Sequence, residues 1–168
     1  VRDGMVVLVE ESPEVRVTVE RSARFYRRGK SWLYRVSVTN DHVRGSGTMA
    51  PMALVPLLHL QHGIPQHLPS VLGDQAVYWT GAQPTFGTLR RFIENLNADE
   101  GDQIFLLFRD DGSFGVERVP QLTGNPIADA LALVGAPAEL PSGVAERALG
   151  MAIGASYSSD LQELAQCY

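Results

Sequence analysis

Residues 32–39 read WLYRVSVT, and their side chains alternate with a two-residue period. Successive side chains of a strand point to opposite faces, so this alternation predicts a β-strand. The even-numbered positions hold Trp32, Tyr34, Val36 and Val38. We expect this set to be buried, and the odd-numbered set, which includes Leu33 and Arg35, to face outward.

Further strands are predicted on both sides of this one. The apolar or alternating runs 5–9 and 15–19 are separated by a turn containing Pro13 and predict an N-terminal hairpin. Residues 27–30 predict the next turn. Later in the chain, Asp110-Asp111-Gly112 predicts a hairpin joining the apolar run 104–108 to a strand through Phe114. The sequence Gly-Asp-Gln precedes both residues 76–79 and residues 104–108, which predicts related positions for these two strands in one sheet.

Helical spacing is found in the middle and at the end of the chain. Leu89, Phe92, Ile93 and Leu96 fall at i, i+3, i+4 and i+7, which predicts an amphipathic helix with Thr88 as its N-cap. Residues 127–134 and 142–153, and those following Ser159, are predicted to be helical as well. Pro51 opens the apolar segment 52–60, in which Pro56 should kink or shorten any helix.

These elements predict an α+β fold. We expect residues 1–120 to form a small, barrel-like antiparallel or mixed β-sheet with two short helices. We expect residues 121–168 to form a C-terminal helical extension. Alternation and helical spacing together predict a core of Trp32, Tyr34, Val36, Val38, Leu89, Phe92, Ile93, Ile104, Leu106 and Phe108.

Composition is that of an ordinary globular protein. The single cysteine, Cys167, excludes an intramolecular disulfide and points to a reducing, cytoplasmic setting. No apolar run reaches the length of about 18 residues that a membrane span needs, so we expect no membrane partner. The chain begins with Val1 rather than Met, and we expect it to be part of a larger polypeptide.

Charge is distributed unevenly along the chain. Residues 16–44 contain eight basic and two acidic residues, a local excess of six positive charges within a net charge of −5. Such an asymmetry predicts either a positive face on an acidic body or a solvated, arginine-rich hairpin.

No complete catalytic or metal-binding pattern is present. His59, His62 and His67 lack the cysteine pair or HExxH context of a zinc site, and no phosphate-binding or dinucleotide fingerprint occurs. We therefore predict no catalytic residue, no metal and no cofactor, although an enzyme with an unrecognised site stays open as an alternative.

Two polar loops carry side chains suited to reading bases. Residues 39–48 offer Asn40, His42, Arg44 and Ser46, and residues 79–88 offer Gln83 and Thr85. Asn, Gln and Arg pair bidentately with base edges in the major groove. Loops are also polar simply because they face water.

The order of these elements resembles the B3-type DNA-binding pseudobarrel, a family of plant transcription-factor domains and restriction-enzyme effector domains. The resemblance covers residues 32–119. It rests on YRVSVTNDHV at 34–43, MAP at 49–51, LRRFI at 89–93 with Leu96, GDQIF at 101–105, and FGV at 114–116. It implies two DNA-gripping arms, at residues 40–47 and 79–85. The first arm has one arginine, Arg44, in place of the lysines that are frequent in the family, and the second has no basic residue.

We therefore expect a double-stranded-DNA-binding, target-recognition module of a larger protein, of a restriction or defence system by analogy with the family. A protein-interaction or scaffolding domain on the same barrel is the alternative, and the net acidity favours it. The predicted DNA-binding residues are Arg24, Arg27, Arg28, Lys30, Arg35, Asn40, His42, Arg44, Ser46, Trp79, Gln83 and Thr85.

Overall fold

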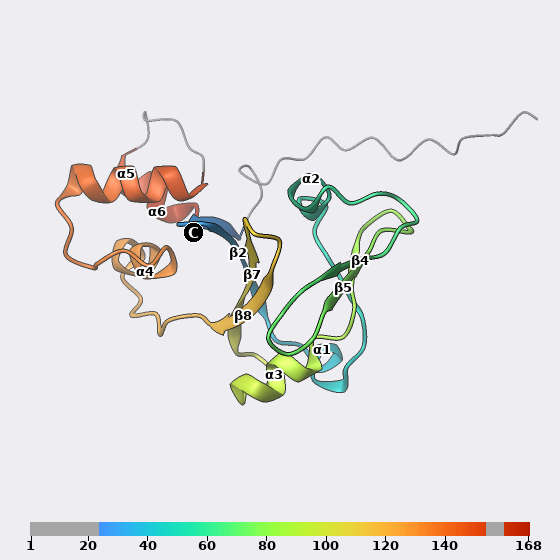
Figure 1. The fold of residues 1–168 in the computed structure, drawn as a ribbon. Helices are drawn as coiled ribbons and strands as arrows, with labels where there is room; N and C mark the ends of the chain where they lie inside the picture. The colour runs from blue at the N-terminus through green and yellow to red at the C-terminus, as the bar shows by residue number, and fades with distance from the viewer. Residues whose placement is uncertain (1–23, 154–159) are drawn as a thin grey trace, which may run out of the picture.

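The computed structural model describes residues 24–153 and 160–168 (Figure 1). The hairpin predicted within residues 5–19 lies outside these residues, as does Ser159, after which the last helix is predicted. In these described residues, eight strands form two antiparallel sheets, and six helices pack against their ends and one face. The α+β class is therefore confirmed. No ladder joins the two sheets among the described strands, so they do not close into a barrel.

The first sheet contains the strand predicted from the WLYRVSVT alternation. Its order is β1-β2-β7-β8, with the bounds β1 Phe25–Arg28, β2 Ser31–Ser37, β7 Gln103–Arg109 and β8 Phe114–Arg118. β1 was not predicted as a strand. It reaches β2 through a tight turn at Gly29-Lys30, where Gly29 has a left-handed φ of 55°. The hairpin predicted at Asp110-Asp111-Gly112 is confirmed, because β7 and β8 pair directly across it.

The second sheet has the order β3-β6-β5-β4. Its bounds are β3 Thr48–Met49, β6 Thr85–Phe86, β5 Gln75–Tyr78 and β4 Gln66–Leu68. The two Gly-Asp-Gln sequences lead into β5 and β7, which lie in different sheets. The predicted placement of both strands in one sheet is therefore wrong, because a local turn signal does not determine which distant strand its product pairs with.

The predicted core is confirmed between the two sheets. Seven of its ten members are buried, and Trp32, Tyr34 and Val36 are partly buried and pack against them. Three short helices border this core, namely α1 Asn40–Arg44, α2 Leu54–Leu58 and α3 Arg90–Leu96. α1 and α3 lie together at one end of the sheets, and α2 lies at the other (Figure 1). Pro56 falls in the first turn of α2, where it interrupts no hydrogen bond of the helix.

A second core lies on the outer face of the first sheet, under the C-terminal helices (Figure 1). These helices are α4 Pro126–Leu133, α5 Ser142–Ile153 and α6 Leu161–Gln166, so the three predicted C-terminal helices are confirmed. Leu33 of β2 is fully buried here, together with Tyr26 and Phe105. The prediction that Leu33 faces outward is wrong, because both faces of the first sheet are covered.

Arg35 lies on the same face of β2 as Leu33 and also contacts the C-terminal segment. Its guanidinium donates to the Tyr168 backbone oxygen and lies over the Tyr26 ring. The C-terminal helices thus share a core with the sheet rather than forming one of their own. Within residues 24–153 and 160–168, none of the helices combines the length and the apolar character needed to cross a membrane.

Candidate nucleic-acid interface

The first predicted arm is ordered by a short helix. Residues 40–47 were expected to be a polar loop, but Asn40–Arg44 form α1, so that prediction is wrong. The backbone N–H of Thr39 donates to His42 Nδ1 at 2.9 Å, and the ring thereby takes the position of the glutamate in a capping box. Gly45, at a left-handed φ of 84°, ends the helix. His42 is therefore a buried capping residue, and the arm presents Asn40, Arg44 and Ser46 to solvent.

Mild acid is expected to destabilise this arm through His42. Burial lowers the pKa of His42 from its ordinary value of 6.5, and the nearby Asp41 carboxylate offsets only part of that shift. The folded state therefore binds fewer protons than the unfolded state. The stabilisation is complete above about pH 6.5 and is lost progressively as the pH falls through that value toward the folded pKa.

The measurement is the free energy of unfolding in urea at about pH 7.5 and about pH 5. His42→Gln retains an acceptor for the Thr39 N–H but cannot take up a proton. We expect this variant to lose less stability on acidification than the wild type does. An equal loss in the two proteins would contradict the assignment.

The second predicted arm is divided between the core and the surface. Trp79 is 2% exposed and packs edge-on against His62, with ring centroids 5.3 Å apart. Its indole Nε1 has no hydrogen-bond partner in the described part of the chain. The following residues, 80–83, are exposed. The surface of this arm therefore consists of Gln83 and its neighbours, and the Trp79 side chain does not reach it.

Pairing between β3 and β6 joins the two arms. Met49 lies opposite Thr85, and the Ala50 N–H donates to the Pro84 oxygen at 2.8 Å. Gly47 allows this close approach, because a Cβ at that position would lie 3.0 Å from the Phe86 carbonyl oxygen. Residues 40–49 and 80–85 thus lie side by side, and we call their exposed part the arm surface.

The predicted basic residues do not gather on this surface. Arg27 forms a bidentate ion pair with Asp110. The hydrogen bonding from Arg27 is the main reason that the pKa of Asp110 is lowered. Arg28 pairs with Glu117. Arg35 is held against the C-terminal helices, as described above. Successive strand residues point to opposite faces, so Arg27 and Arg28 cannot contribute to a single positive face.

Two arginines do lie at the arm surface, one within it and one beside it. Arg44 is exposed in α1, and Arg90, at the start of α3, lies next to Gly45. Arg90 was not among the predicted site residues, because no local pattern links it to residue 45. It forms an i,i+4 ion pair with Glu94, and both side chains remain more than half exposed. Lys30 is exposed at the β1–β2 turn, at the opposite end of β2 from α1.

A cavity of about 470 Å³ opens beside the arm surface, between β2 of one sheet and β3 of the other. We call it the seam cavity. Its lining includes Arg24, Val36, Ser37, Asp41, Met49 and Phe86. Both sheets and the first arm help to line it.

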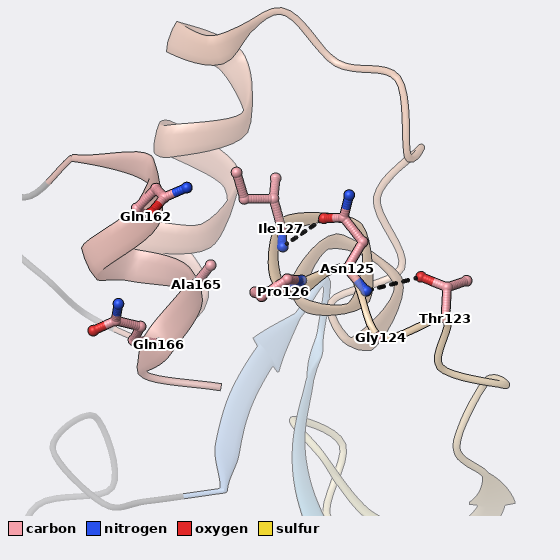
Figure 2. A pocket seen from close by; sticks show the side chains of 8 residues that line it. All are labelled: Thr123, Gly124, Asn125, Pro126, Ile127, Gln162, Ala165 and Gln166. Carbon is pink, nitrogen blue, oxygen red and sulfur yellow. Dashed lines mark hydrogen bonds between the residues drawn. The ribbon is translucent and has the colours of Figure 1, made fainter.

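A larger cavity, of about 600 Å³, lies between the start of α4 and α6 (Figure 2). The Asn125 side chain accepts from the Ile127 and Ala128 N–H groups at this helix start. The Asp129 carboxylate accepts from the backbone N–H groups of Thr123 and Gly124. The backbone donors that would bind an anion there are already used within the chain.

No metal centre is assembled in the described residues, where no three His, Cys, Asp or Glu side chains come together. Three histidines could be considered as zinc ligands from the sequence. In the structure, His62 packs on Trp79, His67 lies in β4 and His59 follows α2.

In comparisons with known proteins, the chain matched no family model, no curated protein and no solved structure.

Proposed function

We propose that this chain is a double-stranded-DNA-binding module that contacts the duplex through the arm surface. The observation that carries the proposal is the β3–β6 pairing, which joins the two arms and leaves Arg44, Ser46 and Gln83 exposed. Arginine and glutamine are suited to base edges, and Arg90 to a phosphate at the border.

The element order supports a B3-type pseudobarrel with an open seam. A strand, an arm, a short helix, paired strands, a second arm, α3 and a Gly-Asp turn into β7 follow one another as in that family. By the same analogy, we propose a cytoplasmic role in target recognition for a larger restriction or defence protein.

The salt dependence of duplex binding tests this function. With about two phosphates neutralised, by the two arginines at the arm surface, the affinity should fall about 12-fold between about 50 and 200 mM salt. The measurement is fluorescence anisotropy of a labelled duplex titrated with the full chain. Absence of duplex binding even at the lower salt would reject the DNA function in favour of protein interaction, which the ion pairs of Arg27 and Arg28 and the net charge of −5 also favour.

Arm variants test which surface binds. Arg44→Ala is expected to weaken duplex binding by about 1–3 kcal/mol, and Gln83→Ala to reduce discrimination between duplex sequences by a similar amount. Arg147→Ala is the matched control, since Arg147 is an exposed arginine on α5, beyond the other face of the first sheet. If Arg147→Ala weakens binding as much as Arg44→Ala does, the arm surface is not the contact.

A further inference from the structure

The seam cavity exists because pairing along one edge of β2 stops early. β1 pairs with β2 only from Ser31 to Tyr34, and one further hydrogen bond runs from the Arg35 N–H to the Arg24 oxygen. β2 continues to Ser37 with no described strand beside it on this edge. Across the gap, β3 is the edge strand of the second sheet. In the described part of the chain, the cavity is therefore bounded by two strand edges that have no other strand paired to them.

Among the residues that the structure describes, Ser37 has no strand partner on the β1 side of β2, so this edge offers a backbone donor and a backbone acceptor to the cavity. Val38 N–H donates to the Asp102 oxygen on the β7 side, whereas Arg35 N–H points to the β1 side. Backbone groups alternate along a strand, so the N–H and C=O of Ser37 point away from β7 and into the seam. The Ser37 hydroxyl is already engaged by the Gln103 side chain.

The rest of the lining combines flat apolar walls with charged groups. Apolar surface comes from Tyr34, Val36, Phe86 and Leu106, and the lining also includes the acidic residue Asp41 and the basic residue Arg24. A planar heteroaromatic ring with donors and acceptors along its edge matches such a lining. A carboxylate acceptor favours a base that carries an exocyclic amino group.

Met49 stands beside this cavity and faces outward. Its side chain is 78% exposed in β3, on the arm surface, and it also contributes to the lining of the cavity. Proteins that distort a duplex frequently insert an apolar side chain, methionine included, between base steps. An exposed methionine next to a cavity of about 470 Å³, which is large enough to admit a nucleobase, is suited to occupy the space that a displaced base leaves.

We propose that the seam cavity accepts a nucleobase with an exocyclic amino group, turned out of a bound duplex, while Met49 fills the vacated position. This inference rests on the DNA-binding function proposed above. An extended peptide fits less well. β3 has only two residues, and β2 is free only around Ser37, so a peptide strand would gain few backbone hydrogen bonds.

The test separates binding from base extrusion. The probe is a short duplex with one central 2-aminopurine, which carries an exocyclic amino group and becomes more fluorescent when it unstacks. A second duplex places the same base in a mismatch, because a mispaired base costs less to extrude. Anisotropy of an end label reports binding, and 2-aminopurine fluorescence reports extrusion.

We expect the full chain to raise the fluorescence of both duplexes, with the larger rise for the mismatch. Met49→Ala should lose most of this rise, whereas Met151→Ala, which alters a methionine 69% exposed on α5, should keep it. Asp41→Asn should lower the rise for 2-aminopurine without abolishing anisotropy binding.

The unfavourable outcomes are distinct from one another. Duplex binding with no fluorescence rise, or with an equal rise for Met49→Ala and wild type, overturns the extrusion proposal and leaves the DNA-binding function standing. Absence of duplex binding overturns both proposals. Binding of free deoxycytidine without duplex binding also overturns extrusion and reassigns the cavity to a soluble nucleoside.

Discussion

Replacing Phe92 with alanine is expected to lower the free energy of unfolding by about 3–5 kcal/mol. Phe92 is 3% exposed in the core between the two sheets. Its ring packs edge-on against Phe114, with centroids 5.2 Å apart, and the Arg91 guanidinium lies 4.4 Å from its ring centroid. Removing the ring leaves a cavity that the two sheets cannot close without shifting their strands.

The measurement is unfolding in urea, with Val71→Ala as the control, because Val71 is 97% exposed. The control should change stability by less than about 0.5 kcal/mol. A similarly small effect for Phe92→Ala would mean that α3 does not pack against the core between the sheets.

Leu33→Ala is expected to cost about 2–5 kcal/mol, although its position in the alternating sequence predicts a surface residue. Leu33 is fully buried in the second core, between β2 and the C-terminal helices. The loss should increase hydrogen exchange in α4 and α5 more than in β5 and β6, since only the helices cover this face.

Met151→Ala removes an apolar side chain from the exposed part of α5 and serves as the control for Leu33→Ala. If both variants change stability by less than about 0.5 kcal/mol, the C-terminal helices do not cover the first sheet. A large loss for Leu33→Ala alone establishes that the helices belong to the same folding unit as the sheet.

The sequence does contain a pattern that indicates the second core. It lies in β7 and not in β2, whose alternation led to the wrong prediction for Leu33. Residues 104–108 are apolar without interruption, which is typical of a strand covered on both faces. β2 pairs with β7 along its whole length, with Leu33 opposite Leu107. The burial of Leu33 therefore follows from the neighbour of β2 rather than from the alternation in β2 itself.

The candidate site was predicted in part for a similar reason. The two arms follow from the order of elements along the chain, and residues 80–83 are exposed as loops should be. The sequence could not predict which acidic residue each arginine pairs with. Arg27, for example, forms its ion pair with Asp110, which is 83 residues away in the sequence. Arg90 comes to lie beside the first arm only because α1 and α3 pack at the same end of the sheets.

By itself, the sequence determined the local elements of this protein: the β2 alternation, the α3 spacing, the Asp110–Gly112 turn and the C-terminal helices. Periodicity and turn chemistry act over a few residues, and neighbouring side chains encode them directly. Only the tertiary structure decided which sheet β5 joins, that both faces of β2 are covered, and that no described strand pairs with β2 beside Ser37 on the seam side. These features depend on contacts between segments far apart in the chain, whose free energies no local pattern contains.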